Sequence, residues 1–431
     1  MANPLTRLID PVTADRDRVA RKYQFTADSR AWLAPLGIGV ALFLVSLVGY
    51  FGDHYQFWYS YLTAWVFCLS ISLGALFFVM FQHVPKAKWV TAVRRFPEML
   101  MANFWLLALF GLPLLLPTAM HDLFHWTHAE LYDPTGSYYD EVVAGKAGYF
   151  FWPGPLGGMP WFFYARIVLY FASWIIVSTK LYRTSVRQDT EPRADVGKDL
   201  RRVSAWGIPL VAVTTGFAAF DLVMSLDPHW FSTIFGVYFF AGGFLAAIAA
   251  VTFMAIAYRQ AGMLRMEIND EHYHDLGKYL FAFTVFWTYI AFSQYMLIWY
   301  GNLPEETVWF EHRLIHGWEN VTYSLIWFHF ILPFFILIPR FTKRILPVLA
   351  IMCVWLLVMH WIDLWWLIKP NLYVATGNEA YEHAAIYWTD ITLWLGFVGI
   401  FAGATLWRAS RHSITPYNDP YFNFSLRFQN V

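Results

Sequence analysis

Long apolar runs separated by short polar segments fill most of the chain after residue 31. A helix needs about 20 apolar residues to cross a hydrocarbon core that is ~30 Å thick. The pattern therefore predicts an all-α polytopic membrane protein of about ten transmembrane helices. We place these helices at residues 32–51, 58–82, 99–120, 160–182, 203–226, 229–258, 276–301, 321–339, 343–368 and 385–408.

Basic residues predict the orientation of these ten runs. Of the 30 Lys and Arg residues, Lys146, Arg313 and Lys369 lie in segments on one side, and Arg166 lies inside the fourth run. All the others lie at or beyond the opposite ends of the runs. Loops rich in Lys and Arg stay in the cytoplasm. We therefore expect the N- and C-termini in the cytoplasm and the three exceptions outside it.

This topology divides the chain into three parts. We expect a cytoplasmic N-terminal arm (residues 1–31), a ten-helix transmembrane domain (32–408) and a cytoplasmic C-terminal tail (409–431). The longest outer loop, residues 121–159, contains clustered Pro and Gly residues, which are turn formers.

Composition agrees with a bilayer environment and restricts the cofactors. Charged residues make up 14% of the chain and hydrophobic residues 58%. The formal net charge is zero, so we expect no nucleic-acid partner. Cys68 and Cys353 are too few for a four-cysteine zinc or iron–sulfur site, and no C-x-x-C-H haem attachment motif is present. No metal-ligand set is visible either, so we expect redox centres of these kinds on other chains.

Four ionisable residues near the outer ends of the third, fourth and fifth runs form the first candidate site. An ionisable group inside a span costs roughly 2.5–3.5 kcal/mol on insertion and usually marks function. His121, Asp122, Arg166 and Asp221 would suit a quinol headgroup if these helices pack together. A carboxylate or neutral His would accept the hydroxyl proton, and Arg would stabilise the anion. A buried ion pair that fixes the bundle explains Arg166 and Asp221 equally well, and interfacial helix capping is the alternative for His121 and Asp122.

A second group suggests a proton relay near the outer face. Its members share hydrogen-bonding side chains in or beside spans, and they are Asp227, Tyr289, Ser293, Gln294, His329, His360, Asp363 and Asp390. Polar contacts between helices are the alternative explanation. Asp227 also fits a helix N-cap with Pro228 at the first helical position. His329 and His360 lie at one depth, which would permit a bis-His haem b.

The depth of these residues in the membrane is uneven. The ionisable candidates lie in the outer half, with His329 near the midplane, whereas the inner half of the spans offers only Ser and Thr hydroxyls. This distribution fits proton release toward the outer side. It offers little for a complete inward proton wire.

Two long and unusual runs carry a family resemblance. The run Ser225–Gly236, SLDPHWFSTIFG, and the run Phe286–Thr307, FWTYIAFSQYMLIWYGNLPEET, closely resemble the second NrfD-like membrane subunit of bacterial alternative complex III. That family is similar to the membrane subunit of polysulfide reductase. The ten-span layout and the length also agree, so the likeness covers essentially the whole chain.

The resemblance implies a location, a set of partners and a role. The complex lies in the bacterial cytoplasmic membrane, oxidises menaquinol and passes electrons through iron–sulfur clusters and haems c on other subunits to a periplasmic acceptor. The partners would be a sister NrfD-like subunit, an iron–sulfur/molybdopterin-like subunit and haem c subunits. The sister subunit has the better-supported quinol site in this family. We therefore expect the present chain to support assembly, an outer proton path and a menaquinone pocket, without turnover by the isolated chain.

Two other functions fit the same sequence. A secondary transporter would use helices interrupted by Gly or Pro in mid-span, for which Pro113, Gly242, Gly243 and Pro333 are candidates. A purely structural membrane scaffold would use the aromatic outer loops for docking.

Overall fold

The computed structural model describes residue 23 and residues 30–154 and 156–429, so most of the expected N-terminal arm lies outside the described residues. The described chain folds into helices and contains no strand. Ten of its helical stretches are long and apolar enough to cross a membrane. The all-α polytopic membrane fold that hydropathy predicts is thereby confirmed.

The spans are built from these elements: α3 (Leu33–Ser46) with α4 (Val48–Gly52), α5 (His54–His83), α6 (Arg95–Met101) with α7 (Phe104–Gly111) and η2 (Leu112–Leu115), α11 (Trp161–Thr190), α12 (Val196–Leu222) with η5 (Met224–Leu226), α13 (Phe235–Gln260), α14 (Asp270–Gly301), α16 (Trp318–Ser324) with η6 (Leu325–Ile331) and α17 (Leu332–Leu337), α18 (Leu346–Ile368) with α19 (Asn371–Thr376), and α20 (Trp388–Arg411). The connections and the tail carry η1 (Trp89–Ala92), α8 (Pro117–Leu123), η3 (His125–Thr127), η4 (Ala129–Tyr132), α9 (Glu141–Gly145), α10 (Ala147–Phe151), α15 (Pro304–Glu311), η7 (Thr342–Arg344), η8 (Glu379–Tyr381) and α21 (Phe422–Leu426).

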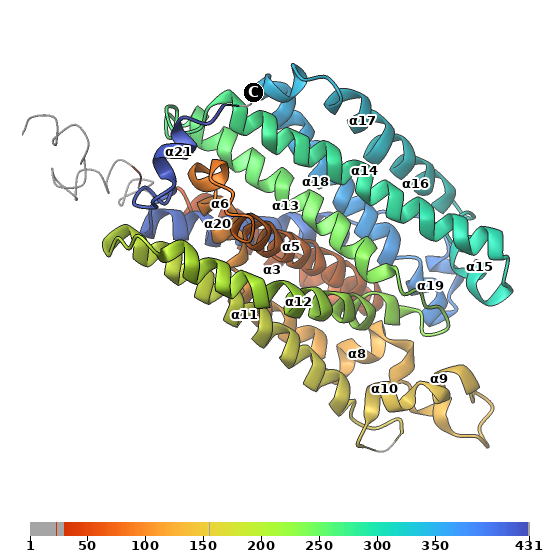
Figure 1. The fold of residues 1–431 in the computed structure, drawn as a ribbon. Coiled ribbons are helices and arrows are strands. Elements are labelled where there is room, and N and C mark those ends of the chain that lie inside the picture. Colours follow the sequence, from red (N-terminus) through yellow and green to blue (C-terminus); the bar gives the residue numbers. More distant parts are fainter. Residues whose placement is uncertain (1–22, 24–29, 155, 430–431) are drawn as a thin grey trace, which may run out of the picture.

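Helix α5 forms the centre of the bundle. Nearly all of its apolar stretch is buried, as expected for a helix that is hydrophobic all round. It packs against α12, α13, α18 and α20 (Figure 1). Helix α3 lies along α20, α11 lies along α12, and α14 with α16 and α17 forms the opposite edge. The buried polar side chains at the centre of the candidate site lie where α5, α13, α14, α18 and the eighth span meet.

Several helix ends differ from the hydropathy prediction. Helix α11 continues to Thr190, α12 begins at Val196 and α14 begins at Asp270, well beyond the apolar runs. Hydropathy marks only the part of a helix that fits the hydrocarbon, whereas the helical hydrogen bonds continue through the charged and polar residues on either side of it. The third span ends at Leu115 because the chain breaks around Pro113 and Pro117. The residues predicted to end that span therefore lie in the separate short helix α8.

The two ends of the bundle carry different structures. Residues 121–159 form short helices around α8, α9 and α10, and we call the end that carries them the outer end (Figure 1). The opposite, inner end carries the C-terminal tail, where the backbone N–H of Ile414 donates to the carbonyl of Tyr23 at 2.9 Å. The described start and end of the chain thus meet at one end, as an even number of spans requires. Which compartment each end faces stays a prediction.

The inner end contains a buried ionic network that the sequence did not suggest. Arg94 pairs with Glu98 at 3.1 Å and with Asp419 of the tail at 2.7 Å, while Arg95 pairs with Asp189 at 3.0 Å. All five residues lie outside the predicted apolar runs, in segments expected to be polar connections or tail, and folding buries them. The expectation that the inner half offers only hydroxyls is therefore wrong at the inner end.

Candidate functional site

A buried carboxylate on α18 is the centre of the candidate site. Asp363 is 1% exposed. Its carboxylate accepts a short hydrogen bond from the Tyr238 hydroxyl on α13 and one from Trp287 Nε1 on α14 at 3.2 Å. A carboxylate at this depth is costly unless it is hydrogen bonded or protonated, and both donors reduce that cost.

Two buried histidines lie close to this carboxylate. His360 lies one helical turn before Asp363 on α18, as their spacing predicts, and its Nε2 lies 2.8 Å from Ser70 Oγ on α5. The His329 ring packs against the Trp287 ring, with centroids 4.0 Å apart and a tilt of 32°. Neither nitrogen of His329 has a hydrogen-bond partner among the described residues. The cluster therefore combines a carboxylate, two imidazoles, a phenol and an indole.

The histidines do not offer open positions for a haem. A methyl group added to Gly242 would lie 3.2 Å from Nδ1 of His360, so this nitrogen faces the backbone of α13. The other nitrogen of His360, Nε2, forms a hydrogen bond with Ser70, and the Trp287 ring covers one face of His329. A porphyrin would need a wide slot beside both rings. The bis-His haem b therefore does not fit this packing.

The segment that carries His329 departs from α-helical geometry. Leu325–Ile331 forms a π-helix inside the eighth span, between α16 and α17. Such wider turns occur mostly as short insertions and are frequent at functional sites. Leu325 and Ile331, the first and last residues of the π-helix, both line the cavity described next.

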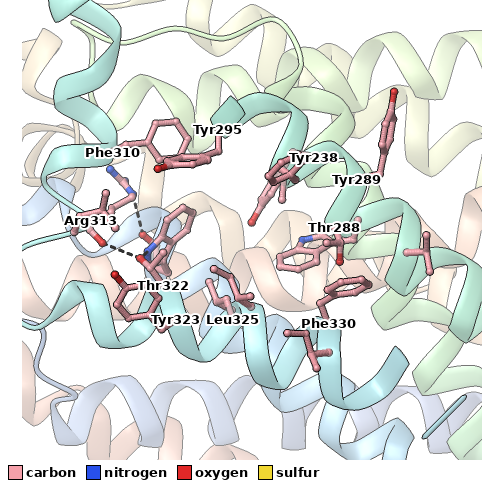
Figure 2. Close-up of a pocket in the computed structure, with 18 residues that line it drawn as sticks. Tyr238, Thr288, Tyr289, Tyr295, Phe310, Arg313, Thr322, Tyr323, Leu325 and Phe330 are labelled. Atoms are coloured by element: carbon pink, nitrogen blue, oxygen red, sulfur yellow. Dashed lines mark hydrogen bonds between the residues drawn. The ribbon is translucent and has the colours of Figure 1, made fainter. Parts of the chain in front are cut away.

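A cavity of about 700 Å³ lies beside the carboxylate, between α14 and the eighth span (Figure 2). Its wall is almost entirely apolar and aromatic, and it includes Tyr238 and Trp287, the two side chains that donate to Asp363. The side chains at its edge are mostly exposed, and they are Tyr289, Phe292 and Tyr323. The cavity therefore opens on the side of the bundle, between two helices. The lining residues are Tyr238, Val285, Trp287, Thr288, Tyr289, Ala291, Phe292, Tyr295, Phe310, Arg313, Leu314, Thr322, Tyr323, Leu325, Ile326, Phe330, Ile331 and Trp366.

Arg313 closes one end of this cavity. Its guanidinium donates to the carbonyls of Trp309 at 2.8 Å, Leu367 at 3.0 Å and Trp366 at 3.3 Å, and it lies 3.4 Å from the Trp309 ring centroid. The last two carbonyls belong to the final turn of α18, where the helix dipole favours a cation. Burial lowers the pKa of Arg313 to about 9, so the group stays charged at neutral pH.

The first predicted group is divided between two contacts. Arg166 and Asp221 form a two-point ion pair, with both N···O distances at 2.8 Å, and Tyr170 donates to the same carboxylate at 2.7 Å. Asp122 lies 2.7 Å from Nδ1 of His54. No hydrogen bond or ion pair among the described residues joins the two contacts.

His121 is largely exposed and stacks on His128 at 4.1 Å. Burial lowers the pKa of His128, which keeps that imidazole neutral near pH 7.

The second predicted group is also only partly assembled. His329, His360 and Asp363 lie together, and Tyr289 lines the adjoining cavity. Ser293 is half-buried and Gln294 is buried on the same helix.

Asp390 belongs to a separate contact, with Ser60 Oγ at 2.6 Å and Lys369 Nζ at 3.0 Å. No hydrogen bond or ion pair in the described chain connects it to Asp363. A relay through all the predicted residues would therefore need water molecules or further groups between these contacts.

Asp227 does not cap the sixth span. Its side chain accepts a hydrogen bond from the backbone N–H of His229 at 3.1 Å, which is a local turn. Helix α13 begins only at Phe235, after a segment in which Trp230 stacks on Trp309 at 4.3 Å. The predicted cap and the predicted start at residue 229 are therefore wrong, because the turn and the Trp stack hold residues 227–234 outside the helix.

Sequence reasoning missed five residues of these contacts. Tyr238 and Trp287 were not singled out because aromatic residues make up 20% of the chain. Ser70 is one of many Ser and Thr residues in the spans, so nothing in the sequence distinguishes it. Arg313 and Lys369 were assigned to outer loops, yet both are nearly fully buried. The only sequence feature that could have indicated burial is the position of Lys369, directly after the ninth apolar run.

Fold and site together define a class of protein: a multi-pass helical membrane protein with a side-opening apolar cavity next to a buried carboxylate. No protein-family model matches the chain, and no curated protein matches it.

Proposed function

We propose that the protein is an integral membrane subunit of a quinol-oxidising respiratory complex, the role implied by its resemblance to the NrfD-like subunits of alternative complex III. The observation that carries the proposal is the buried carboxylate of Asp363, held by two side chains that also line an apolar cavity. Iron–sulfur and haem c subunits would supply the electron carriers, and the membrane would be the bacterial cytoplasmic membrane.

The cavity suits a quinol on size and surface. Pockets for small molecules measure about 300–1,000 Å³ and combine apolar walls with a few polar groups. The cavity falls within this range, and its aromatic residues offer faces against which a quinol ring can stack. Its opening between Tyr289 and Tyr323 would admit the ring directly from the lipid phase, with the isoprenoid tail left in the bilayer.

The hydrogen bonds around Asp363 provide a route for protons. Oxidation of a quinol to a quinone releases two electrons and two protons. One quinol hydroxyl gives its proton to the Tyr238 oxygen while Tyr238 gives its own proton to Asp363, and one electron leaves to the partner clusters. After Asp363 has lost this proton, the same relay accepts the second, and the second electron follows. His360 lies one turn away and can influence release from the carboxylate.

Substitution of the two relay residues tests this function in the assembled complex. Asp363→Asn keeps an acceptor for Tyr238 but cannot take a proton, and Tyr238→Phe removes the connecting hydroxyl. General-base effects are about 10²–10⁴-fold, so quinol turnover should fall at least ~10²-fold in both variants. The matched control is Tyr61→Phe, which removes another buried hydroxyl, one that donates to the Phe110 carbonyl at 2.7 Å. It should leave turnover near the wild-type rate.

Assembly must be measured on the same samples, as haem c per purified complex. Full turnover of Asp363→Asn in an intact complex would remove the proton relay. The chain would then be a structural scaffold for its partners, which is the alternative that its exposed aromatic surface supports.

A further inference from the structure

We propose that His316, Glu382 and His383 form a binding site for one Zn²⁺ ion at the outer end of the bundle. Their ligand atoms, two imidazole nitrogens and a carboxylate oxygen, all lie within 4.8 Å of one another. His316 lies between α15 and α16, and the other two residues follow η8. The proposal does not depend on quinol oxidation, because these residues lie outside the cavity and the Asp363 cluster.

The side chains already converge on one point. His316 Nε2 lies 2.9 Å from Glu382 Oε1, and the rings of His316 and His383 have centroids 5.4 Å apart at an angle of 85°. Zinc binds such nitrogen and oxygen atoms at about 2.0–2.2 Å, which places neighbouring ligands of a tetrahedral ion about 3.3 Å apart. Small rotations of the half-buried Glu382 and the exposed His383 would close the remaining distance.

Hydrogen bonds hold the loop of His316 beside the loop of Glu382 and His383. The N–H of Ala384 donates to the carbonyl of His316 at 3.0 Å, and Trp318 Nε1 donates to the carbonyl of Glu382 at 3.1 Å. His316 itself has a φ of 54°, in the left-handed region that residues with a side chain rarely adopt. Non-glycine residues kept in this region cluster at ligand-binding positions. Here the conformation directs the imidazole toward the second loop.

The structure leaves room for a fourth ligand. A crevice of about 10 Å³ borders His316 and Glu382, which is close to the volume that one water molecule needs. His312 lines the same crevice, and its Nδ1 has no hydrogen-bond partner among the described residues. A zinc-bound water placed there would give that nitrogen a partner.

The donor set selects the kind of metal. Two imidazoles and one carboxylate suit zinc and related transition metals, whereas Mg²⁺ and Ca²⁺ prefer oxygen ligands throughout. Three protein ligands plus water is the arrangement of an open zinc site. The bound ion would join residues 312–317 to residues 378–387 and so stiffen the outer loops next to the cavity.

Metal content of the full chain in detergent tests the site. After chelator treatment, incubation with Zn²⁺ and desalting, the wild-type chain should retain one zinc more than His383→Ala or Glu382→Gln. Both positions are accessible enough for the substitutions to be tolerated. Loss of a ligand should weaken zinc binding by at least the ~10–100-fold seen for loss of an outer-shell partner. The matched control is Glu379→Gln, an exposed carboxylate of the same loop, which should retain the zinc.

Cobalt provides a second readout on the same proteins. Co²⁺ in the wild-type chain should give the visible absorption of a four-coordinate site, and the His383→Ala chain should not. Equal zinc retention by the wild-type, His383→Ala and Glu382→Gln chains would overturn the proposal, whether they all retain zinc or all lose it. Because neither readout involves turnover, this result is independent of the fate of the quinol proposal.

Discussion

Three buried cations of this protein have partners of two kinds, carboxylates for two of them and backbone carbonyls for the third. Arg166 pairs with one carboxylate across α11 and α12, Lys369 pairs with Asp390 at 3.0 Å, and Arg313 lies against the carbonyls that end α18. A buried charge that loses its partner keeps its desolvation penalty, whereas replacement of both partners by apolar groups is often neutral. The Arg166–Asp221 contact can therefore be tested as structure or as a quinol site by removing one partner or both.

We expect Arg166→Met alone to lower the free energy of unfolding by roughly 3–5 kcal/mol, because Asp221 would stay buried without its cation. The double variant Arg166→Met/Asp221→Leu should recover most of this loss. Thermal unfolding of the purified chain measures both. Within the assembled complex the double variant should also turn over quinol at the wild-type rate. A stable double variant without turnover would instead identify this pair as part of the quinol site.

At the residue scale, the sequence identified the costly side chains but not their partners. Asp363, His360 and His329 could be predicted because ionisable groups are rare in spans. Which aromatic hydroxyl or indole donates to Asp363 depends on how α13 and α14 rotate against α18, and one sequence contains no record of that rotation. Tyr238 and Trp287 therefore became visible only in the fold.

At the scale of elements, α5 and α13 cross in close contact through glycines. A methyl group added to Gly74 would lie 2.3 Å from the carbonyl oxygen of Gly243, and one added to Gly243 would lie 2.9 Å from the carbonyl oxygen of Ser70. Small residues let membrane helices approach in this way. The crossing also places Ser70 within reach of His360, so the packing of two helices positions one member of the site.

We expect Gly74→Ala to destabilise the chain by roughly 1–3 kcal/mol, since the added methyl group must push α5 and α13 apart. Gly37→Ala on α3 is the matched control, because no atom lies within 4 Å of the added group. That control should be neutral or stabilising by about 0.5–1 kcal/mol through helix propensity. Thermal unfolding in one detergent compares the two. Equal stabilities would mean that the α5–α13 contact is looser than described.

The same crossing bears on the transporter alternative. Gly242 and Gly243 were candidates for a helix interruption, yet α13 runs unbroken from Phe235 to Gln260. Their role is close packing. Interruptions occur instead at Pro113 in the third span and at the π-helix before Pro333. Hydropathy locates spans without showing such breaks, because proline in a membrane helix is tolerated with or without a kink.

At the scale of the whole molecule, the number of spans followed from hydropathy alone. The ends of α11, α12 and α14 did not, because those helices extend into charged and polar segments that hydropathy treats as loop. The order of packing around α5 did not either, since apolar faces in a bilayer contact lipid or protein equally well. Orientation rests entirely on the distribution of Lys and Arg.

Cysteine labelling of intact cells tests that orientation. Ser137→Cys lies in the outer segment, and Ala194→Cys lies between α11 and α12, both exposed. The natural Cys68 and Cys353 are buried, so the background should be low. A membrane-impermeant maleimide should label Ser137→Cys in intact cells and Ala194→Cys only after lysis. The reverse pattern would invert the membrane topology and reverse the direction of proton release.

The most direct test of the quinol cavity is photolabelling of the intact complex with a photoreactive quinone, followed by mapping of the modified peptides. We predict adducts within residues 285–301 of α14 and 318–331 of the eighth span, and their loss when excess quinol competes. Adducts confined to partner subunits, or to the segment around Arg166 in this chain, would contradict the assignment of the cavity beside Asp363 as the quinol site.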